Sequence, residues 1–330
     1  MNETIDILIA TYNGEKYLKE QLDSILGQTY ENIRLIISDD YSKDRTREIL
    51  KEYEQKDSRV KVHYQEQNLG YIRNFEYLLK QVENEIYMLS DQDDVWLENK
   101  VKKTLEALKN EKADLVFGDL EVVNQNLDVM YESFGDFMKL NGKIEKYIND
   151  KRLNYLYNCV TGCTIMSKKK FIEIILPIPY VSKYVAHDHW IALVLSLNGK
   201  VVYMKEKNIL YRQHGNNEIG TQKISHKFEK LEEVRKLFLE VKLGIFKTYV
   251  ENEKIFSEEM RNLNKKAYNY YIMLENKKNF NFKGWKIFHR LYKAEKIMYY
   301  IQNFIIMNLP FIGKGIFKIR YVILKFLGKR

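Results

Sequence analysis

The sequence predicts an α/β fold, with a mostly parallel sheet covered by helices on both faces and a helical C-terminal extension. Three observations carry this prediction. Short β-branched runs alternate with helical patterns of about ten residues over the first third of the chain. Polar clusters directly follow the apolar runs, where parallel sheets bind their ligands. After Gly220 the composition shifts to Lys, Glu, Phe and Tyr in long helical periodicity.

The elements predicted in the first half of the chain follow from local patterns. Apolar residues recur at helical spacing after each strand-like run, as at Leu18, Leu22 and Ile25, and Asp44 is well placed to cap the second helix. The predicted elements are a strand at Ile5–Ala10, a helix at Tyr17–Leu26, a strand at Ile33–Ile37, a helix at Arg45–Tyr53, a strand at Val60–Tyr64, a helix at Tyr71–Val82, a strand at Ile86–Leu89, a helix at Glu98–Leu108 and a strand at Leu115–Phe117.

The pattern loosens beyond residue 120. We expect a short strand at Gly162–Met166, a helix at His187–Leu197, and two strands at Val201–Met204 and Ile209–Arg212. The shift in composition after Gly220 predicts one domain at 1–222 and a helical, basic region at 223–330.

Composition excludes several classes of protein. With 45% apolar and 30% charged residues among 330, the chain is not generally disordered. No stretch approaches twenty uninterrupted apolar residues, and the N-terminus carries acidic residues where a secretory signal has basic ones. Cys159 and Cys163 cannot form a disulfide framework or a four-ligand zinc site, and we expect small buried residues there. These features predict a cytoplasmic protein.

Charge is divided unevenly along the chain. Residues 1–220 carry 30 Lys and Arg against 35 Asp and Glu, a net charge of −5. Residues 221–330 carry 24 against 10, a net of +14. A basic tail on an acidic body suits an anionic surface such as lipid headgroups or nucleic acid, and the alternative is a solvated helical face.

The sequence Ser90-Asp91-Gln92-Asp93-Asp94-Val95-Trp96 places three carboxylates in four residues, directly after a hydrophobic strand. Crowded carboxylates repel one another unless a cation offsets their charge. Hard divalent cations prefer oxygen ligands, and Mg²⁺ combines one or two carboxylates with phosphate oxygens. The cluster therefore favours a metal that holds a phosphorylated ligand over an acidic turn that caps the next helix.

A second acidic pair, Asp39 and Asp40, follows the second strand. One of these carboxylates could accept a hydrogen bond from a base N–H or a ribose hydroxyl, and the alternative is a capped loop. The chain has no G-x-G-x-x-G after its first strand and no G-x-x-x-x-G-K-[ST], which argues against a dinucleotide fold and a P-loop NTPase.

Taken together, these motifs resemble those of family 2 glycosyltransferases of the Rossmann-like GT-A fold, over roughly residues 4–220. The matching segments occur in family order. They are Ala10-Thr11-Tyr12-Asn13, Asp39-Asp40-x-Ser42-x-Asp44, Asn68-Leu69-Gly70 with Arg73-Asn74-Phe75, Asp91-Gln92-Asp93-Asp94-Val95-Trp96, Gly162-Cys163-Thr164, His187-Asp188-x-Trp190 and Tyr211-Arg212-Gln213-His214-Gly215-Asn216-Asn217.

The resemblance implies a set of residues that bind the donor, a nucleoside diphosphate sugar. Thr11 and Tyr12 would line the nucleobase pocket, and Asp40 would contact the base. Arg73 would meet the phosphates, and Asp91 would hold the ribose or the sugar.

It also implies a metal site and a catalytic base. Asp93 and His214 would bind Mg²⁺ or Mn²⁺, although a hydrogen-bonded loop histidine is the alternative for His214. Asp188 would be the base, with a helix cap or a structural ion pair as its alternative. Gly162, His187 and Trp190 would lie on the acceptor side. Many members of the family have Glu where this chain has His187, so the role of His187 stays open.

The implied activity is inverting transfer of a hexose or 6-deoxyhexose to a saccharide hydroxyl. The DQDDVW and YRQHGNN forms are most similar to the bacterial rhamnosyltransferase branch, which implies dTDP-L-rhamnose as donor and a growing, lipid-linked surface polysaccharide as acceptor. A UDP-linked donor is the alternative within the same fold. A nucleic-acid-binding protein and a catalytically silent scaffold are the alternatives from other classes. The acidic body and the absence of a nucleic-acid-binding motif argue against the first of these, and the complete acidic set argues against the second.

The C-terminal tail lies outside the matched segments. Residues 283–330 hold 11 Lys and Arg and a single acid, Glu295. The segments Tyr299–Phe311 and Ile316–Leu327 mix aromatic and aliphatic residues with basic ones and suit helices lying at a membrane surface. We therefore expect peripheral attachment to the inner face of the cell membrane, and the alternatives are packing on the catalytic domain or a dimer contact.

Overall fold

The computed structural model describes residues 3–138, 144–145, 158–180, 185–215 and 231–276, together with 286, 287 and 289. The chain divides into two compact units, one of residues 1–178 and 186–220 and the other of 179–185 and 221–330. The expected division into functional domains at 222/223 stays a prediction.

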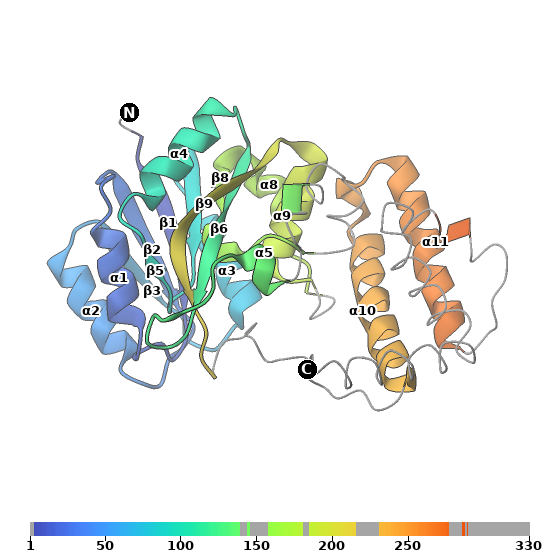
Figure 1. Cartoon of the computed structure of the whole chain (residues 1–330), viewed down its shortest axis with the longest axis horizontal. Coiled ribbons are helices and arrows are strands. Elements are labelled where there is room, and N and C mark those ends of the chain that lie inside the picture. Colours follow the sequence, from blue (N-terminus) through green and yellow to red (C-terminus); the bar gives the residue numbers. More distant parts are fainter. Residues whose placement is uncertain are drawn as a thin grey trace. The chain divides into compact units, whose positions relative to one another are not determined.

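The first unit contains one mixed sheet and the helices around it (Figure 1). Its elements are β1 (Ile5–Thr11), α1 (Leu18–Leu26), β2 (Ile33–Asp39), α2 (Thr46–Lys56), β3 (Val60–Tyr64), α3 (Tyr71–Lys80), β4 (Ile86–Ser90), β5 (Val95–Trp96), α4 (Lys100–Asn110), β6 (Leu115–Val123), β7 (Val129–Tyr131), α5 (Phe134–Phe137), η1 (Gly162–Thr164), β8 (Met166–Lys168), η2 (Lys169–Phe171), α8 (Ile172–Ile175), α9 (His187–Asn198) and β9 (Val201–Arg212).

Strand order explains how the site is assembled. In the described part of the chain the strands follow the order β3-β2-β1-β4-β8-β6-β9-β5, and β7 pairs with β6. The first four strands along the chain are parallel to one another. Because β8 is antiparallel to both β4 and β6, and β6 is parallel to β9, strand β9 runs in the same direction as β1. The C-terminal ends of β1, β2, β4 and β9 therefore lie at one edge of the sheet.

The core follows from the alternation of side chains along the strands. Ile5, Ile7 and Ile9 belong to a buried cluster that includes the apolar residues of α1, α2 and α4. Leu8 is fully buried on the opposite face, where α3 packs against β1 and β2. Helices on both faces of a mostly parallel sheet confirm the predicted fold class.

Two helix starts show how local chemistry sets the boundaries. Asp44 accepts a hydrogen bond from the Thr46 N–H at 3.0 Å, so its carboxylate satisfies a first-turn donor of α2. The helix itself begins at Thr46, one residue later than predicted. Gly70 precedes α3 with a φ of +79°, a conformation that glycine adopts without steric cost.

Two local predictions from the sequence are wrong, and the structure contains further elements that were not predicted. Gly162–Thr164 is a 3-10 helix, and the strand begins only at Met166. The two strands predicted within 201–212 are a single strand, β9, which stays paired with β6 through shifts in register. Strands β5 and β7 and helix α5 were not expected at all.

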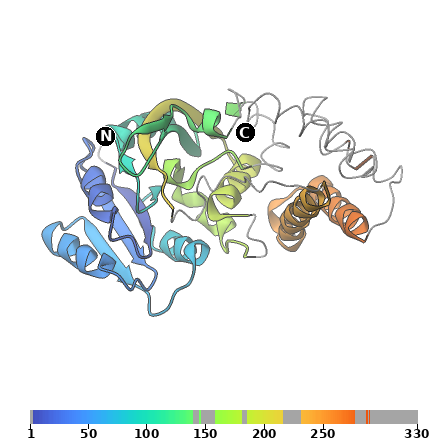
Figure 2. The same cartoon turned by 60° about the horizontal axis from the view of Figure 1, so that its bottom comes forward.

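In the second unit, α10 (Leu231–Glu251) and α11 (Glu258–Glu275) form an antiparallel helix pair joined through η3 (Glu253–Ile255) (Figures 1 and 2). Phe246 and Tyr271 stack with ring centroids 5.5 Å apart, and Ser257 caps α11 by accepting from the Met260 N–H. The described part of the C-terminal region is thus helical, as predicted. Among the described helices, none combines the length and the apolar character needed to cross a bilayer. Both predicted amphipathic segments, 299–311 and 316–327, lie outside the described residues.

Candidate active site

The loop after β1 and the loop after β4 meet through Tyr12 and Gln92. The Tyr12 N–H donates to Gln92 Oε1 at 2.9 Å, and Gln92 Nε2 donates to the Tyr12 carbonyl at 3.0 Å. A Cβ at Gly14 would overlap Gln92 Oε1, so a larger residue there would displace the Gln92 side chain from its bonds to Tyr12. The ring of Tyr12 is 46% exposed and thus free to stack on a ligand.

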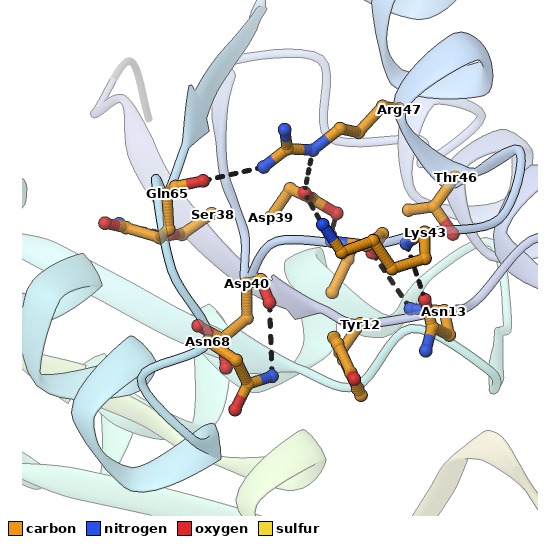
Figure 3. Close-up of polar contacts among 12 residues, drawn as sticks. Tyr12, Asn13, Ser38, Asp39, Asp40, Lys43, Thr46, Arg47, Gln65 and Asn68 are labelled. Carbon is orange, nitrogen blue, oxygen red and sulfur yellow. Dashed lines mark hydrogen bonds and ion pairs between the residues drawn. The ribbon is translucent and has the colours of Figure 1, made fainter.

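Two buried aspartates at the end of β2 have different partners (Figure 3). Asp39 accepts from Thr11 Oγ1 at 3.3 Å and from Arg47 Nε at 2.6 Å. Asp40 accepts from the N–H groups of Leu69 and Gly70, at 2.6 and 2.9 Å. Burial, and to a smaller extent the charge of Asp39, raises the pKa of Asp40.

Through these two bonds Asp40 holds the segment that leads into α3. Asn68 in that segment donates to the Asp40 carbonyl at 3.2 Å, and its side chain is exposed. Figure 3 shows Tyr12, Asp40 and Asn68 around one part of the strand edge. An aromatic face with amide and carboxylate groups beside it can bind a nucleobase.

The acidic loop after β4 meets the end of β9. Asp93 Oδ2 and His214 Nε2, 121 positions apart in sequence, lie 2.8 Å from one another. Asp94 is fully buried and accepts from the Arg212 N–H at 3.0 Å. Burial and the charges of Asp93 and Asp91 raise the pKa of Asp94 well above its usual value. The structure thus brings together the residues predicted to hold a metal.

A second group of possible ligand atoms adjoins this pair. Single atoms of Asp91, Asp94 and Cys163 all lie within 4.8 Å of one another. Burial and the two carboxylates raise the pKa of the Cys163 thiol, and sulfur is too soft a ligand to suit Mg²⁺ or Mn²⁺. The carboxylates of this loop, with the imidazole of His214, are the better donors for Mg²⁺ or Mn²⁺.

Asp188 lies in the first turn of α9 and is buried. Its Oδ1 accepts from the His189 N–H at 2.6 Å and from Asn158 Nδ2 at 3.1 Å. Burial raises the pKa of Asp188 to about 6, although these bonds and one from the Gly162 N–H oppose the rise. The negative charge of Asp188 in turn contributes to raising the pKa of Asp91, after burial and Asp93, which places Asp188 near the acidic loop.

The remaining predicted residues have mainly internal contacts. His187 stacks on Phe75 with centroids 4.0 Å apart, and burial lowers its pKa to about 3. A Cβ at Gly162 would lie 2.9 Å from His187 Nε2, which makes glycine the residue that fits. Trp190 is buried and donates to the Ile175 carbonyl at 2.8 Å.

Arg73, predicted to meet the phosphates, has contacts within the protein. It is paired with Glu76, and its Nη1 also donates to the Ile178 carbonyl at 3.2 Å. Two residues without a predicted role lie close to the acidic loop. Arg212 contacts the acidic loop directly, and its place two residues before His214 was the available signal. Lys100 is 2% exposed, and burial lowers its pKa to about 8.

Comparisons with known proteins agree with this geometry. The family model described as glycosyl transferase family 2 matches residues 6–175. The dTDP-rhamnosyl transferase RfbG of Shigella flexneri is 30% identical over 224 residues, which span 64% of this chain and 73% of that protein.

A second relative is the UDP-Glc:alpha-D-GlcNAc-diphosphoundecaprenol beta-1,3-glucosyltransferase WfgD of Escherichia coli, 26% identical over 182 residues, which span 54% of this chain and 65% of that protein. Among solved structures, S. aureus TarS in complex with UDP-GlcNAc superposes with a TM-score of 0.56 at 18% identity, over 82% of this chain and 72% of that chain. This last similarity concerns the fold.

Proposed function

Because the chain belongs to glycosyltransferase family 2, we propose that it transfers a sugar from a nucleoside diphosphate to a saccharide hydroxyl with inversion at the anomeric carbon. The observation that carries the proposal is the convergence of Asp93, His214, Asp91 and Asp188 at one edge of the sheet. Tyr12, Asp40 and Thr11 lie at the ends of the neighbouring strands, where a nucleotide would bind.

The donor-binding side rests on groups that the fold holds in place. The exposed ring of Tyr12 supplies a stacking surface, and Asp40 with the turn before α3 that it holds supplies polar groups for the base. Thr11 ends β1 with its hydroxyl bonded to Asp39. Asp91 is the first residue of the acidic loop and interacts electrostatically with Asp188, and we propose that its carboxylate meets the ribose or the sugar.

A divalent cation fits this site. Asp93 and His214 present a carboxylate oxygen and an imidazole nitrogen side by side, and we propose that they hold Mg²⁺ or Mn²⁺. When bound, the ion stabilises the negative charge of the departing diphosphate. Asp188 acts as the general base that removes the proton from the acceptor hydroxyl. Its pKa of about 6 leaves it ionised at neutral pH and still basic enough to accept that proton.

For the donor we propose dTDP-L-rhamnose, because the relative from Shigella flexneri is named a dTDP-rhamnosyl transferase. UDP-linked sugars are the second candidate, favoured by the names of the Escherichia coli relative and of the S. aureus complex. A lipid-linked saccharide is the proposed acceptor, since the name of the Escherichia coli relative specifies a diphosphoundecaprenol.

A thermal-shift screen tests the donor. Only a nucleotide sugar that binds the folded protein raises its melting temperature, by mass action. We expect dTDP-L-rhamnose with Mn²⁺ to give the largest shift. A larger shift with a UDP-sugar would replace the donor, and the absence of a shift with every nucleotide sugar would contradict the proposed function.

A second experiment tests the metal. Asp93→Ala should abolish transfer, and EDTA should inactivate the unchanged protein until excess Mn²⁺ is added back. Asp136→Ala, at an exposed position of α5, is the matched control and should retain activity. Full turnover in chelator would exclude a metal-dependent mechanism.

A further inference from the structure

Asp93 and His214 both lie outside regular secondary structure. Asp93 belongs to the turn between β4 and β5, and His214 comes two residues after β9 ends. A metal site needs its ligand atoms at fixed separations, yet the strand pairing closest to these residues ends at Val95 and at Arg212, two residues from each of them. The 2.8 Å approach of their side chains must therefore depend on other contacts.

Arg212, the last residue of β9, supplies these contacts from a side chain that is only 3% exposed. Its Nε donates to the Asp93 carbonyl at 2.8 Å, and its Nη1 donates to the Gln125 carbonyl at 2.8 Å. Its Nη2 forms an ion pair with Glu20 of α1. One guanidinium thus joins the acidic loop after β4, the turn between β6 and β7, and helix α1.

Tyr17, the residue before α1, completes the arrangement. The guanidinium carbon of Arg212 lies 4.5 Å from the centroid of the Tyr17 ring. The imidazole of His214 stacks on the same ring with centroids 4.8 Å apart and planes inclined by 27°. The start of α1 therefore supports both Arg212, which bonds the backbone of Asp93, and the ring of His214.

We propose that Arg212 is a positioning residue for the metal, which holds the backbone of Asp93 and, through Tyr17, the ring of His214 in ligating geometry. This inference rests on the proposed metal-binding role of Asp93 and His214. Lysine could not take the place of Arg212, because a single ammonium cannot direct donors at three separate acceptors in one plane. Loss of an outer partner of a metal ligand lowers metal affinity about 10–100-fold.

The chain offers a matched control. Arg34 is bonded to a similar number of groups, since it bonds both carboxylate oxygens of Asp6 in β1, and in the turn between α3 and β4 it donates to the Gln81 carbonyl and pairs with Glu83. It does so from the N-terminal half of β2, at the edge of the sheet opposite the site. A lysine at position 34 therefore loses a comparable set of bonds away from Asp93.

Binding of Mn²⁺ to the full chain, measured by electron paramagnetic resonance with Mn²⁺ alone and with UDP or dTDP added, tests the proposal without relying on turnover. Arg212→Lys should weaken Mn²⁺ binding at least 10-fold, whereas Arg34→Lys should lower the melting temperature and leave Mn²⁺ affinity unchanged. Glu20→Gln removes one anchor of the guanidinium at a half-exposed position, and it should weaken binding less than Arg212→Lys. If Arg212→Lys does not fold, Glu20→Gln decides the question.

The outcomes separate this inference from the proposed function. Wild-type Mn²⁺ affinity in both Arg212→Lys and Glu20→Gln, with binding lost in Asp93→Asn, would overturn the positioning role alone. Unchanged Mn²⁺ affinity in Asp93→Asn, or no binding by the wild type, would overturn the metal site and the positioning role with it. Equal weakening by Arg34→Lys would show a general effect of stability and would also overturn the inference.

Discussion

Two opposing effects set the basicity of Asp188. Burial favours the neutral acid, while donated hydrogen bonds from His189, Gly162 and Asn158 favour the carboxylate. Burial prevails, and the pKa comes to about 6. The same three donors fix the orientation of the carboxylate, so the residue is both held in place and basic at neutral pH.

Asp188→Asn keeps the shape of this side chain but cannot accept a proton. We expect turnover to fall about 10²–10⁴-fold, the usual contribution of a general base. Donor affinity, measured by titration calorimetry, should change little because the base serves the acceptor. Asp114→Asn is the control, since Asp114 lies before β6 and pairs with Lys168 and Lys170. It should lower stability and leave turnover intact, and wild-type turnover in Asp188→Asn would exclude Asp188 as the base.

The raised pKa of Asp188 also predicts a pH dependence. Only the carboxylate is active, so kcat/KM should fall as the pH drops below about 6 and reach a plateau above it. Asp91 is the neighbouring acid whose charge interacts with that of Asp188, and the N–H groups of His189 and Gly162 and the amide of Asn158 are bonded to its carboxylate. Initial rates at saturating Mn²⁺ give the profile. A limb near about 4, the ordinary value for aspartate, would contradict the assignment.

At the scale of elements, the nucleotide-binding side depends on how α3 begins. The two oxygens of Asp40 accept the N–H groups of Leu69 and Gly70, which immediately precede that helix. These two bonds, together with the donation of Asn68 Nδ2 to the Asp40 carbonyl, tie the turn before α3 to the end of β2. A side chain at the end of β2 thus sets a loop almost 30 residues further along the chain.

Asp40→Asn tests this arrangement, because an amide offers one acceptor where the carboxylate offers two. One of the two N–H groups then faces a donor, at a cost of about 1–3 kcal/mol for a buried unsatisfied group. We expect faster hydrogen exchange at Leu69 and Gly70 and weaker nucleotide binding. Asp57→Asn, in the turn before β3, removes a carboxylate bonded to Arg59 and should change neither. Unchanged exchange at Leu69 and Gly70 would contradict the role of Asp40.

The strands of the first half could be predicted from the sequence because their runs are short, apolar and bounded by polar loops. The structure of residues 162–166 could not be predicted in this way. All of these residues are buried, so the segment has no alternation of apolar and polar residues that would distinguish a strand from a 3-10 helix. The polar residues Lys205–Asn208 indicated a loop, yet they remain in β9 through pairing with β6, which local sequence does not encode.

The site divides in the same way. Asp93 and His214 could be predicted as metal ligands from the motifs that contain them, because carboxylates and imidazoles are common metal ligands. Arg212 could not be assigned a role, because its function lies in three contacts to backbone and side-chain groups far apart in sequence. The internal contacts of Trp190 and Arg73 likewise depend on packing partners that no local pattern specifies.

At the scale of the whole molecule, charge is separated from chemistry. The acidic residues that form the site precede residue 220, whereas the net charge of +14 belongs to residues 221–330. The described part of the second unit is a helix pair whose core is built from aromatic residues such as Phe246 and Tyr271. A transferase with a lipid-linked acceptor would work at a membrane surface, and a strongly basic region would hold it there.

Residues 283–330 provide the test of this last proposal, although nearly all of them lie outside the described part of the chain. Their net charge is 11 − 1 = +10, and each basic residue near an anionic surface adds about 1 kcal/mol. We expect the full chain to co-sediment with vesicles containing phosphatidylglycerol at low salt and to dissociate as salt rises. Deletion of 283–330 should abolish binding and spare transfer to a lipid-free acceptor, because every proposed catalytic residue precedes it.

A full-length variant with the tail's Lys and Arg changed to Gln separates the effect of charge from that of the apolar segments. Unfolding of the deleted chain would favour packing of the tail on the catalytic domain, and a full chain that ignores anionic vesicles at low salt would refute the membrane proposal outright.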